Sequence, residues 1–173
     1  SIAGAISTGT HGTGLAFGNI PSQVKELTIV TASGEVLTFS EKENSSYFKA
    51  SLISLGTLGI IVKVKLKIIK TPIYEYRSEK LKYSLLEKQL DQLIQENRHF
   101  EFYLFPYSDL VQIKKMNITD KKPKKLFFHR LSSLLLENYL YFMLSEISRH
   151  FPSLSQNISK LSAWGVGTAS VAG

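Results

Sequence analysis

The first eighteen residues constrain the fold more than any other part of the chain. They place five glycines around a single histidine, His11. Glycine has no Cβ, so its backbone can adopt positive φ and approach a flat or anionic ligand closely. Ordering so many glycines costs conformational entropy and gains little packing. The segment therefore predicts a ligand-cradling loop, with hydroxyls of Thr8, Thr10 and Thr13 between the glycines at positions 4, 9, 12, 14 and 18.

Composition sets the class of protein. The chain has 173 residues, of which 43% are hydrophobic, so it can bury a core and is predicted to be globular. The net charge is +7, with a dense lysine cluster at positions 121, 122, 124 and 125. We expect this cluster to be a solvated loop, and we expect no nucleic-acid partner, while a peripheral membrane contact stays open. The absence of cysteine excludes disulfides and thiolate chemistry.

The first part of the chain predicts a small antiparallel sheet. A strand over 24–31, a turn over 32–35 and a strand over 36–39 form a hairpin pattern. A short helix is expected over 46–55, capped by Asn44 or Ser45. A long strand over 60–70 follows, in which Lys63, Lys65 and Lys67 alternate with apolar residues. That alternation predicts one solvent-exposed face that carries the lysines, and one buried face formed by Val62, Val64, Leu66 and Ile68.

Thr71-Pro72 predicts a domain boundary, giving domains 1–71 and 72–173. The second domain is predicted as a compact α+β layer. Its expected elements are strand 74–81, a helix over 84–96 capped by Ser84, strand 99–105, turn 106–109 and strand 110–115.

The apolar segment 126–151 is interrupted by charged residues, which argues against a membrane span. We expect a buried or interface helix there. A helix lying on a membrane surface is the alternative.

The chemistry of the opening loop matches neither common phosphate loop, because it lacks the Walker A lysine and the Rossmann glycine spacing. Its backbone N–H groups could still bind oxygens of a pyrophosphate or a flavin ring. His11 could be a metal ligand, an acid or base, or a histidine held by a backbone bond. Because the four histidines are far apart in sequence and no carboxylate is nearby, we predict no metal.

Three motifs together carry a resemblance to a known family. Residues 1–14 resemble the second FAD-contact segment of flavoproteins of the vanillyl-alcohol-oxidase type, also called PCMH-type, and most closely the sugar-lactone oxidases. This subfamily includes D-arabinono-1,4-lactone, L-gulono-1,4-lactone and alditol oxidases. Residues 54–61 (SLGTLGII) are similar to the second hallmark of that domain. Residues 100–109 (FEFYLFPYSD) resemble the aromatic strand and turn that open the substrate cap of the lactone oxidases. Beyond Lys121 the resemblance fades.

The resemblance implies an α+β fold. Domain 1–71 would be the second half of a PCMH-type FAD-binding domain, and domain 72–173 the beginning of an α+β substrate (cap) domain. Ser1 would lie beside the isoalloxazine ring and the substrate. The remaining implied FAD contacts are Ile6, Gly9, Thr10, His11, Gly12, Thr13 and Gly14, together with the backbone of Ile60 and Ile61.

The implied reaction is oxidation of a sugar-1,4-lactone or polyol by hydride transfer to flavin, with oxygen or another electron acceptor as the oxidant. The family's first FAD half and its distal catalytic residues have no counterpart here. We therefore expect the chain to be a piece of a longer polypeptide whose remainder is its partner, and to be inactive alone. His11 is not expected to carry a covalent flavin. The alternatives are a flavin dehydrogenase using another acceptor, or a non-catalytic binding module with a basic surface.

Overall fold

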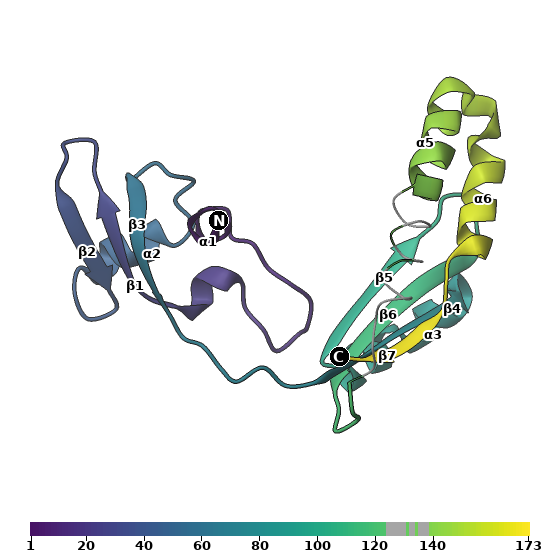
Figure 1. Cartoon of the computed structure of the whole chain (residues 1–173), viewed down its shortest axis with the longest axis horizontal. Helices are drawn as coiled ribbons and strands as arrows, with labels where there is room; N and C mark the ends of the chain where they lie inside the picture. Colours follow the sequence, from purple (N-terminus) through teal and green to yellow (C-terminus); the bar gives the residue numbers. More distant parts are fainter. Residues whose placement is uncertain (124–130, 132–133, 135–138) are drawn as a thin grey trace. The chain divides into compact units, whose positions relative to one another are not determined.

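The computed structural model describes residues 1–123, 131, 134 and 139–173. The chain divides into two compact units, Ser1–Thr71 and Pro72–Gly173 (Figure 1). Each unit combines helices with one antiparallel sheet, so the predicted α+β class is confirmed.

The first unit opens with a helix where the sequence predicted only loop. Helix α1 spans Ile2–Ser7, and the Ser1 hydroxyl caps it by accepting a hydrogen bond from the Gly4 N–H at 3.2 Å. A side-chain oxygen at the N-cap satisfies one of the otherwise unpaired N–H groups of the first turn, which stabilises a helix this short. The prediction of a loop from Ser1 was therefore wrong for residues 2–7.

The sheet of the first unit has the strand order β2-β1-β3, with both pairs antiparallel. Strands β1 (Val24–Val30) and β2 (Val36–Ser40) form the predicted hairpin, and the 3-10 helix η1 (Ile20–Gln23) precedes them. Helix α2 (Ser45–Ser51) ends earlier than predicted. Asn44 occupies its N-cap position, but its side chain makes no capping bond. The core consists of Ile6, Val24, Leu27, Ile29, Phe39 and Phe48.

Strand β3 (Ile60–Leu66) is shorter than predicted and does not alternate simply. Opposite β1, Lys63 pairs with Thr28 and Ile61 pairs with Ile29, so Val62 is an extra residue in the ladder. Such a bulge shifts the side-chain alternation by one position. Ile61, Val64 and Leu66 pack against the core, whereas Val62 is exposed. The predicted burial of Val62 and Ile68 was therefore wrong, because of the bulge and because the strand ends before Ile68.

The second unit has a four-stranded antiparallel sheet in the order β5-β6-β4-β7. Helix α3 (Tyr83–Glu96) packs on one face of it, where Leu86, Val111 and Ile113 form the buried core. The helix starts one residue before the predicted cap Ser84, and its N-cap is Lys82, which makes no side-chain bond. The prediction of a Ser84 cap was therefore wrong. The strands are β4 (Tyr74–Lys82), β5 (His99–Leu104), β6 (Leu110–Ile118) and β7 (Ala169–Ala172).

A helical hairpin precedes β7. Helix α5 (Tyr141–His150), the 3-10 helix η3 (Pro152–Leu154) and helix α6 (Ser155–Gly165) follow one another, and α5 packs against α6 (Figure 1). Helix α5 lies within the segment predicted to be a buried or interface helix, yet none of its residues is fully buried. Residues 124–130, 132–133 and 135–138 of that segment and of the lysine cluster lie outside the described residues. Among described helices, none combines the length and apolar character needed to cross a bilayer.

Candidate functional site

The glycine-rich loop follows α1 and is closed by two backbone hydrogen bonds at Thr10. The Thr10 N–H donates to the Ala5 carbonyl at 2.9 Å, and the Ile20 N–H donates to the Thr10 carbonyl at 2.8 Å. Gly9 turns the chain out of the helix with φ +67°, a backbone conformation that L side chains rarely adopt. Residues between Thr10 and Ile20 therefore form an excursion anchored at both ends.

His11 and Gly12 lie at the exposed part of this excursion. The His11 Nδ1 lies 3.0 Å from the Gly12 carbonyl oxygen, so the ring is held by a local backbone bond. Gly12 does not adopt positive φ, and a Cβ built on it would meet no atom within 4 Å. Within the described part of the chain, the N–H groups of His11 and Gly12 donate no hydrogen bond to another residue. Two exposed amide donors and a bare backbone are therefore available to a ligand.

The second glycine motif lies against the first. The Leu55 N–H donates to the Ser7 carbonyl at 3.1 Å, and Gly9 lies against the Ile53 side chain. Gly59 has φ +136°, and a Cβ there would lie 2.3 Å from the Val30 carbonyl oxygen. Only glycine lets the chain pass this close to β1 as it enters β3.

The predicted FAD contacts lie on α1, on the glycine-rich loop and at the start of β3, all in the first unit, and their side chains differ in access. Ile6 is 0% exposed over the whole residue and belongs to the core. Ile61 packs against the core, Ile60 is exposed, and both pair with β1 in the sheet. The Ser1 hydroxyl caps α1. The contacts themselves stay predictions.

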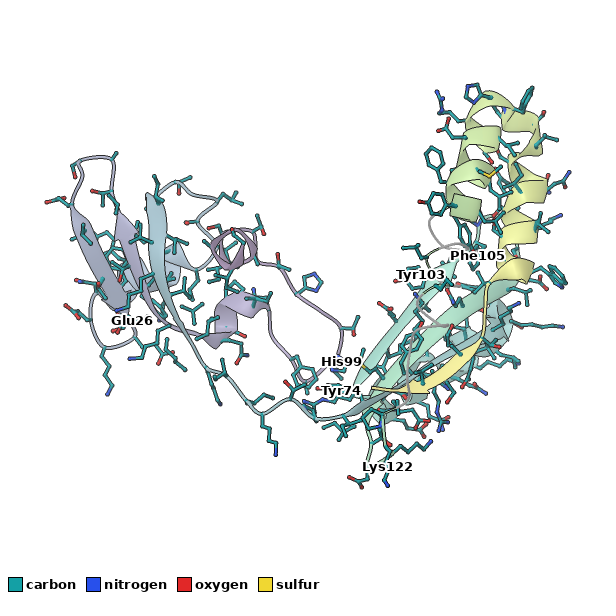
Figure 2. The ribbon with its side chains drawn as sticks, in the orientation of Figure 1. Glu26, Tyr74, His99, Tyr103, Phe105 and Lys122 are labelled. Carbon is teal, nitrogen blue, oxygen red and sulfur yellow. The ribbon has the colours of Figure 1, made fainter. Side chains whose placement is uncertain are left out.

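The histidines and carboxylates of the described residues form no cluster of three or more that could hold a metal ion. In the second unit the His99 ring instead meets Tyr74 edge to face, with centroids 5.8 Å apart (Figure 2). Lys121 and Lys122 are exposed, and Lys121 pairs with Glu75 at 2.6 Å. Because Lys121 donates to this carboxylate and Arg77 lies beside it, the pKa of Glu75 falls below its usual range.

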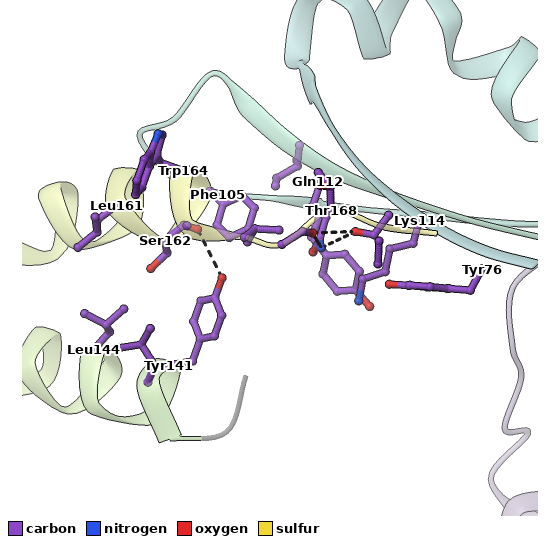
Figure 3. Close-up of a pocket in the computed structure, with 18 residues that line it drawn as sticks. Tyr76, Phe105, Gln112, Lys114, Tyr141, Leu144, Leu161, Ser162, Trp164 and Thr168 are labelled. Carbon is purple, nitrogen blue, oxygen red and sulfur yellow. Dashed lines mark hydrogen bonds between the residues drawn. The ribbon is translucent and has the colours of Figure 1, made fainter. Parts of the chain in front are cut away.

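The second unit holds a cavity that sequence reasoning missed. It measures about 630 Å³ and lies between the sheet face opposite α3 and the α5–α6 hairpin (Figure 3). Small-molecule sites are typically about 300–1,000 Å³. The floor is polar and comes from Tyr76, Ser78, Tyr103, Gln112 and Lys114.

The walls of the cavity are mainly apolar. Leu140, Tyr141 and Leu144 come from α5 and the residue before it, and Leu161 comes from α6. Tyr141 points toward α6, where its hydroxyl donates to the Ser162 carbonyl at 3.4 Å, and Leu144 lies between α5 and α6 (Figure 3). One signal could have revealed the floor: Gln112 and Lys114 alternate with the apolar residues Val111 and Ile113 along β6. This alternation marks a strand with one polar face.

Comparison with known proteins identifies the family. Residues 64–172 match the family model described as D-arabinono-1,4-lactone oxidase. Similar proteins include the L-gulono-1,4-lactone dehydrogenase of Mycobacterium tuberculosis (35% identity over 164 residues, 93% of this chain and 37% of the relative). The D-arabinono-1,4-lactone oxidase of Yarrowia lipolytica is 34% identical over 166 residues (92% and 30%). The L-gulonolactone oxidase of Bos taurus is 31% identical over 167 residues (93% and 36%).

The chain therefore spans between 30% and 37% of the length of these three relatives. The match covers the end of the first unit and nearly all of the second. The resemblance to sugar-lactone oxidases read from the glycine motifs and the aromatic strand is confirmed, and the chain belongs to the D-arabinono-1,4-lactone oxidase family.

Proposed function

We propose that this chain is part of a FAD-dependent oxidoreductase that oxidises a sugar-1,4-lactone or alditol at a CH–OH group, with oxygen as electron acceptor. The family match carries the proposal, and the relatives named as lactone oxidases support oxygen as the acceptor. Residues 1–71 would be the second half of a PCMH-type FAD-binding domain. Residues 72–173 would begin the cap domain that covers the substrate.

The exposed glycine loop fits a flavin cofactor. The free N–H groups at His11 and Gly12, in the described part of the chain, can donate to oxygens of a pyrophosphate or an isoalloxazine ring. The bare face of Gly12 lets a flat ring approach the backbone. Gly9, Thr10, Thr13 and Gly14 would complete this wall, and Ile6, which is buried in the core, would support it.

Three further residues would contribute from the ends of neighbouring elements. Ile60 and Ile61 would contact the cofactor through their backbone, and Ser1 would face the ring and the substrate. FAD, when bound, supplies the electron-accepting chemistry, and the protein positions it. The role of this chain's residues is to hold the cofactor by backbone contacts and to exclude water from one side of it. Two backbone hydrogen bonds at Thr10 anchor the loop.

A second candidate is a dehydrogenase that passes electrons to a carrier other than oxygen. The name of the Mycobacterium tuberculosis relative, L-gulono-1,4-lactone dehydrogenase, favours it. The two candidates share the cofactor and the donor and differ only in the acceptor.

The test is made on the full-length protein. We expect a yellow preparation whose visible flavin absorption bleaches when L-gulono- or D-arabinono-1,4-lactone is added under nitrogen. Recovery of the colour on admitting air, with oxygen uptake at an electrode, supports the oxidase. Dye reduction without oxygen uptake supports the dehydrogenase. A colourless protein that takes up no added FAD contradicts both.

A further inference from the structure

The sheet face that forms the cavity floor carries more positive than negative charge. Side chains alternate between the two faces of a strand, so Lys80 and Lys82 of β4 share this face with Lys114 of β6. Among the strand residues, all of which the structure describes, Glu101 on β5 is the one carboxylate on this face. The other carboxylates of the strands alternate with these positions and belong to the face toward α3. The floor therefore favours a negatively charged ligand.

Most polar groups around the floor already have partners within the protein. The Lys80 ammonium donates to the Trp164 carbonyl near the end of α6, where helix carbonyls lack intrahelical partners. The Ser78 hydroxyl donates to the Gly167 carbonyl at 3.2 Å, and the Gln112 amide nitrogen donates to the Ser78 hydroxyl at 2.8 Å (Figure 3). Lys80 therefore holds the end of the helical hairpin and adds positive charge, while the neutral groups are engaged.

Lys114 is the charged group of the floor that lacks such a partner. Its Nζ lies 4.4 Å from the centroid of the Tyr103 ring, within the range of a cation–π interaction. The ammonium forms no salt bridge with another described residue, although Glu101 lies directly opposite Lys114 in the register. Tyr103 lines the cavity, so the ammonium is turned toward the cavity. Its N–H groups can therefore donate to an anion there.

The walls of the cavity present apolar surface that the protein does not cover. Leu104, Leu140 and Leu161 line the cavity, and each of them remains exposed. Removing such surface from water is favourable, and the hydrocarbon part of a ligand would do so. The cavity therefore combines one available ammonium on its floor with uncovered leucines in its walls.

We infer that the cavity binds an amphipathic monocarboxylate, a hydrocarbon body that carries one carboxylate, such as a medium-chain fatty acid. The carboxylate accepts hydrogen bonds from the Lys114 ammonium, and Lys80 adds to the positive potential. The hydrocarbon lies against the leucines of the walls. This ligand is distinct from the substrate of the proposed function, whose contact at Ser1 belongs to the first unit, so the inference goes beyond that function.

The test titrates decanoate into the full-length protein by calorimetry, below the concentration at which decanoate forms micelles. We expect saturable binding of decanoate. Decanol has the same chain without the charge, and it should bind about tenfold or more weakly. Absence of decanoate binding overturns the inference, and so do equal affinities for decanoate and decanol.

Two neighbouring lysines provide variants with the same change in net charge. Lys114→Met should weaken decanoate binding about tenfold or more, because a charge-assisted hydrogen bond is lost. The matched control is Lys115→Met, whose side chain pairs with Glu79 at 2.8 Å on the face toward α3, and its affinity should stay within about twofold. Lys114→Gln replaces the methionine variant if that variant does not fold. Unchanged affinity without the Lys114 ammonium overturns the inference.

Two exposed leucines of the hairpin locate the hydrocarbon part. Leu161 lines the cavity, whereas Leu154 in η3 does not. Leu161→Glu places a second carboxylate in the wall and should weaken decanoate binding about tenfold or more. Leu154→Glu should leave the affinity within about twofold of wild type. Equal affinities for the two variants put decanoate outside the cavity and overturn the inference.

Competition with the lactone separates this site from the substrate site. The affinity for decanoate should be the same within about twofold with and without saturating L-gulono-1,4-lactone, because the two ligands bind at different sites. Displacement of decanoate by the lactone makes the cavity the substrate site and overturns the inference. A protein that binds decanoate but takes up no FAD contradicts the proposed function alone, so the two failures are distinguishable.

Discussion

The backbone N–H of Leu55 donates to the carbonyl oxygen of Ser7 at 3.1 Å, which joins the two glycine motifs of the first unit. Ser7 ends α1, and Leu55 lies in the turn before β3. Leu55 has φ +51°, although it is not a glycine, and its side chain is 73% exposed. The connection between the motifs is therefore made by a residue in an unfavourable backbone conformation.

Replacing Leu55 should reveal this strain. We expect Leu55→Gly to raise the free energy of unfolding by about 0.5–1 kcal/mol, because relief of the left-handed conformation exceeds the added entropy of the unfolded chain. Leu55→Val should lower it by about 1–2 kcal/mol, since a β-branched residue tolerates positive φ least. Urea denaturation measures both. A glycine variant less stable than wild type contradicts the expectation.

Gly59→Ala should destabilise the first unit by about 2–4 kcal/mol, because it adds both positive-φ strain and a clash. The added Cβ would lie 2.3 Å from the Val30 oxygen and 2.8 Å from a methyl group of Ile29. Gly56→Ala is the matched control: φ is +81°, but the surrounding space is open. We expect it to cost only about 1–2 kcal/mol. Denaturation curves in which the two variants coincide would show that the clash has no effect.

Gly12→Ala should separate cofactor binding from stability. A Cβ at this position meets no protein atom and requires no unusual φ, so the unfolding free energy should change by less than about 0.5 kcal/mol. In the full-length protein we expect FAD affinity to fall about tenfold, because the methyl group keeps the ligand from the loop backbone. Fluorescence titration of flavin into flavin-free protein gives the comparison. Unaltered affinity would argue against a flavin contact at Gly12.

Glu75 should contribute to the acid sensitivity of the second unit. Its pKa is lowered below 4.5 by the hydrogen bond from Lys121, with Arg77 adding to the effect. A lowered folded-state pKa gives stability that is present above the unfolded-state pKa and is lost as pH falls through the folded-state value. We therefore expect wild type to lose its advantage over Glu75→Gln below about pH 4.5. Thermal unfolding of wild type and Glu75→Gln, at about five pH values between roughly pH 3 and pH 7, measures this difference in stability.

The control for this pH dependence is Asp91→Asn. This carboxylate on α3 is exposed and forms no salt bridge with another described residue. Its stability difference from wild type should vary less with pH than that of Glu75→Gln. If the stability differences of both variants from wild type change equally with pH, Glu75 does not account for the acid sensitivity.

Local sequence patterns predicted much of the fold. The β1–β2 hairpin, α3 and strands β4 to β6 follow from period-2 and helical spacing that the tertiary structure did not override. Helix α1 was missed because its small residues and hydroxyls are typical of a loop, whereas the Ser1 cap and the burial of Ile6 in the core stabilise the helix. Strand β7 was missed because its small residues form a strand through pairing with β4, a long-range contact. No local pattern could show the bulge at Val62.

Of the candidate site, the glycine motifs could be predicted from the sequence and the cavity could not. The glycine loop and residues 54–61 could be recognised from composition and from the resemblance to one family. Glycines mark positions where the backbone needs positive φ or a close approach, so they are visible in the sequence. The cavity could not, because it needs the register that places Lys114 opposite Ser78 and the packing of α5 with α6 across that face. Side chains brought together from four strands and two helices leave no spacing signature in the sequence.

Strand β3 has a consequence for the behaviour of the isolated chain in solution. In the described sheet of the first unit it pairs only with β1, so its outer edge presents a row of unsatisfied amides and carbonyls beside the exposed side chains of Ile60 and Val62. Apolar edges of this kind template strand addition between molecules. Samples of these 173 residues should therefore associate progressively with concentration, and lysines at positions 63 and 65 on the same strand should make that association sensitive to ionic strength.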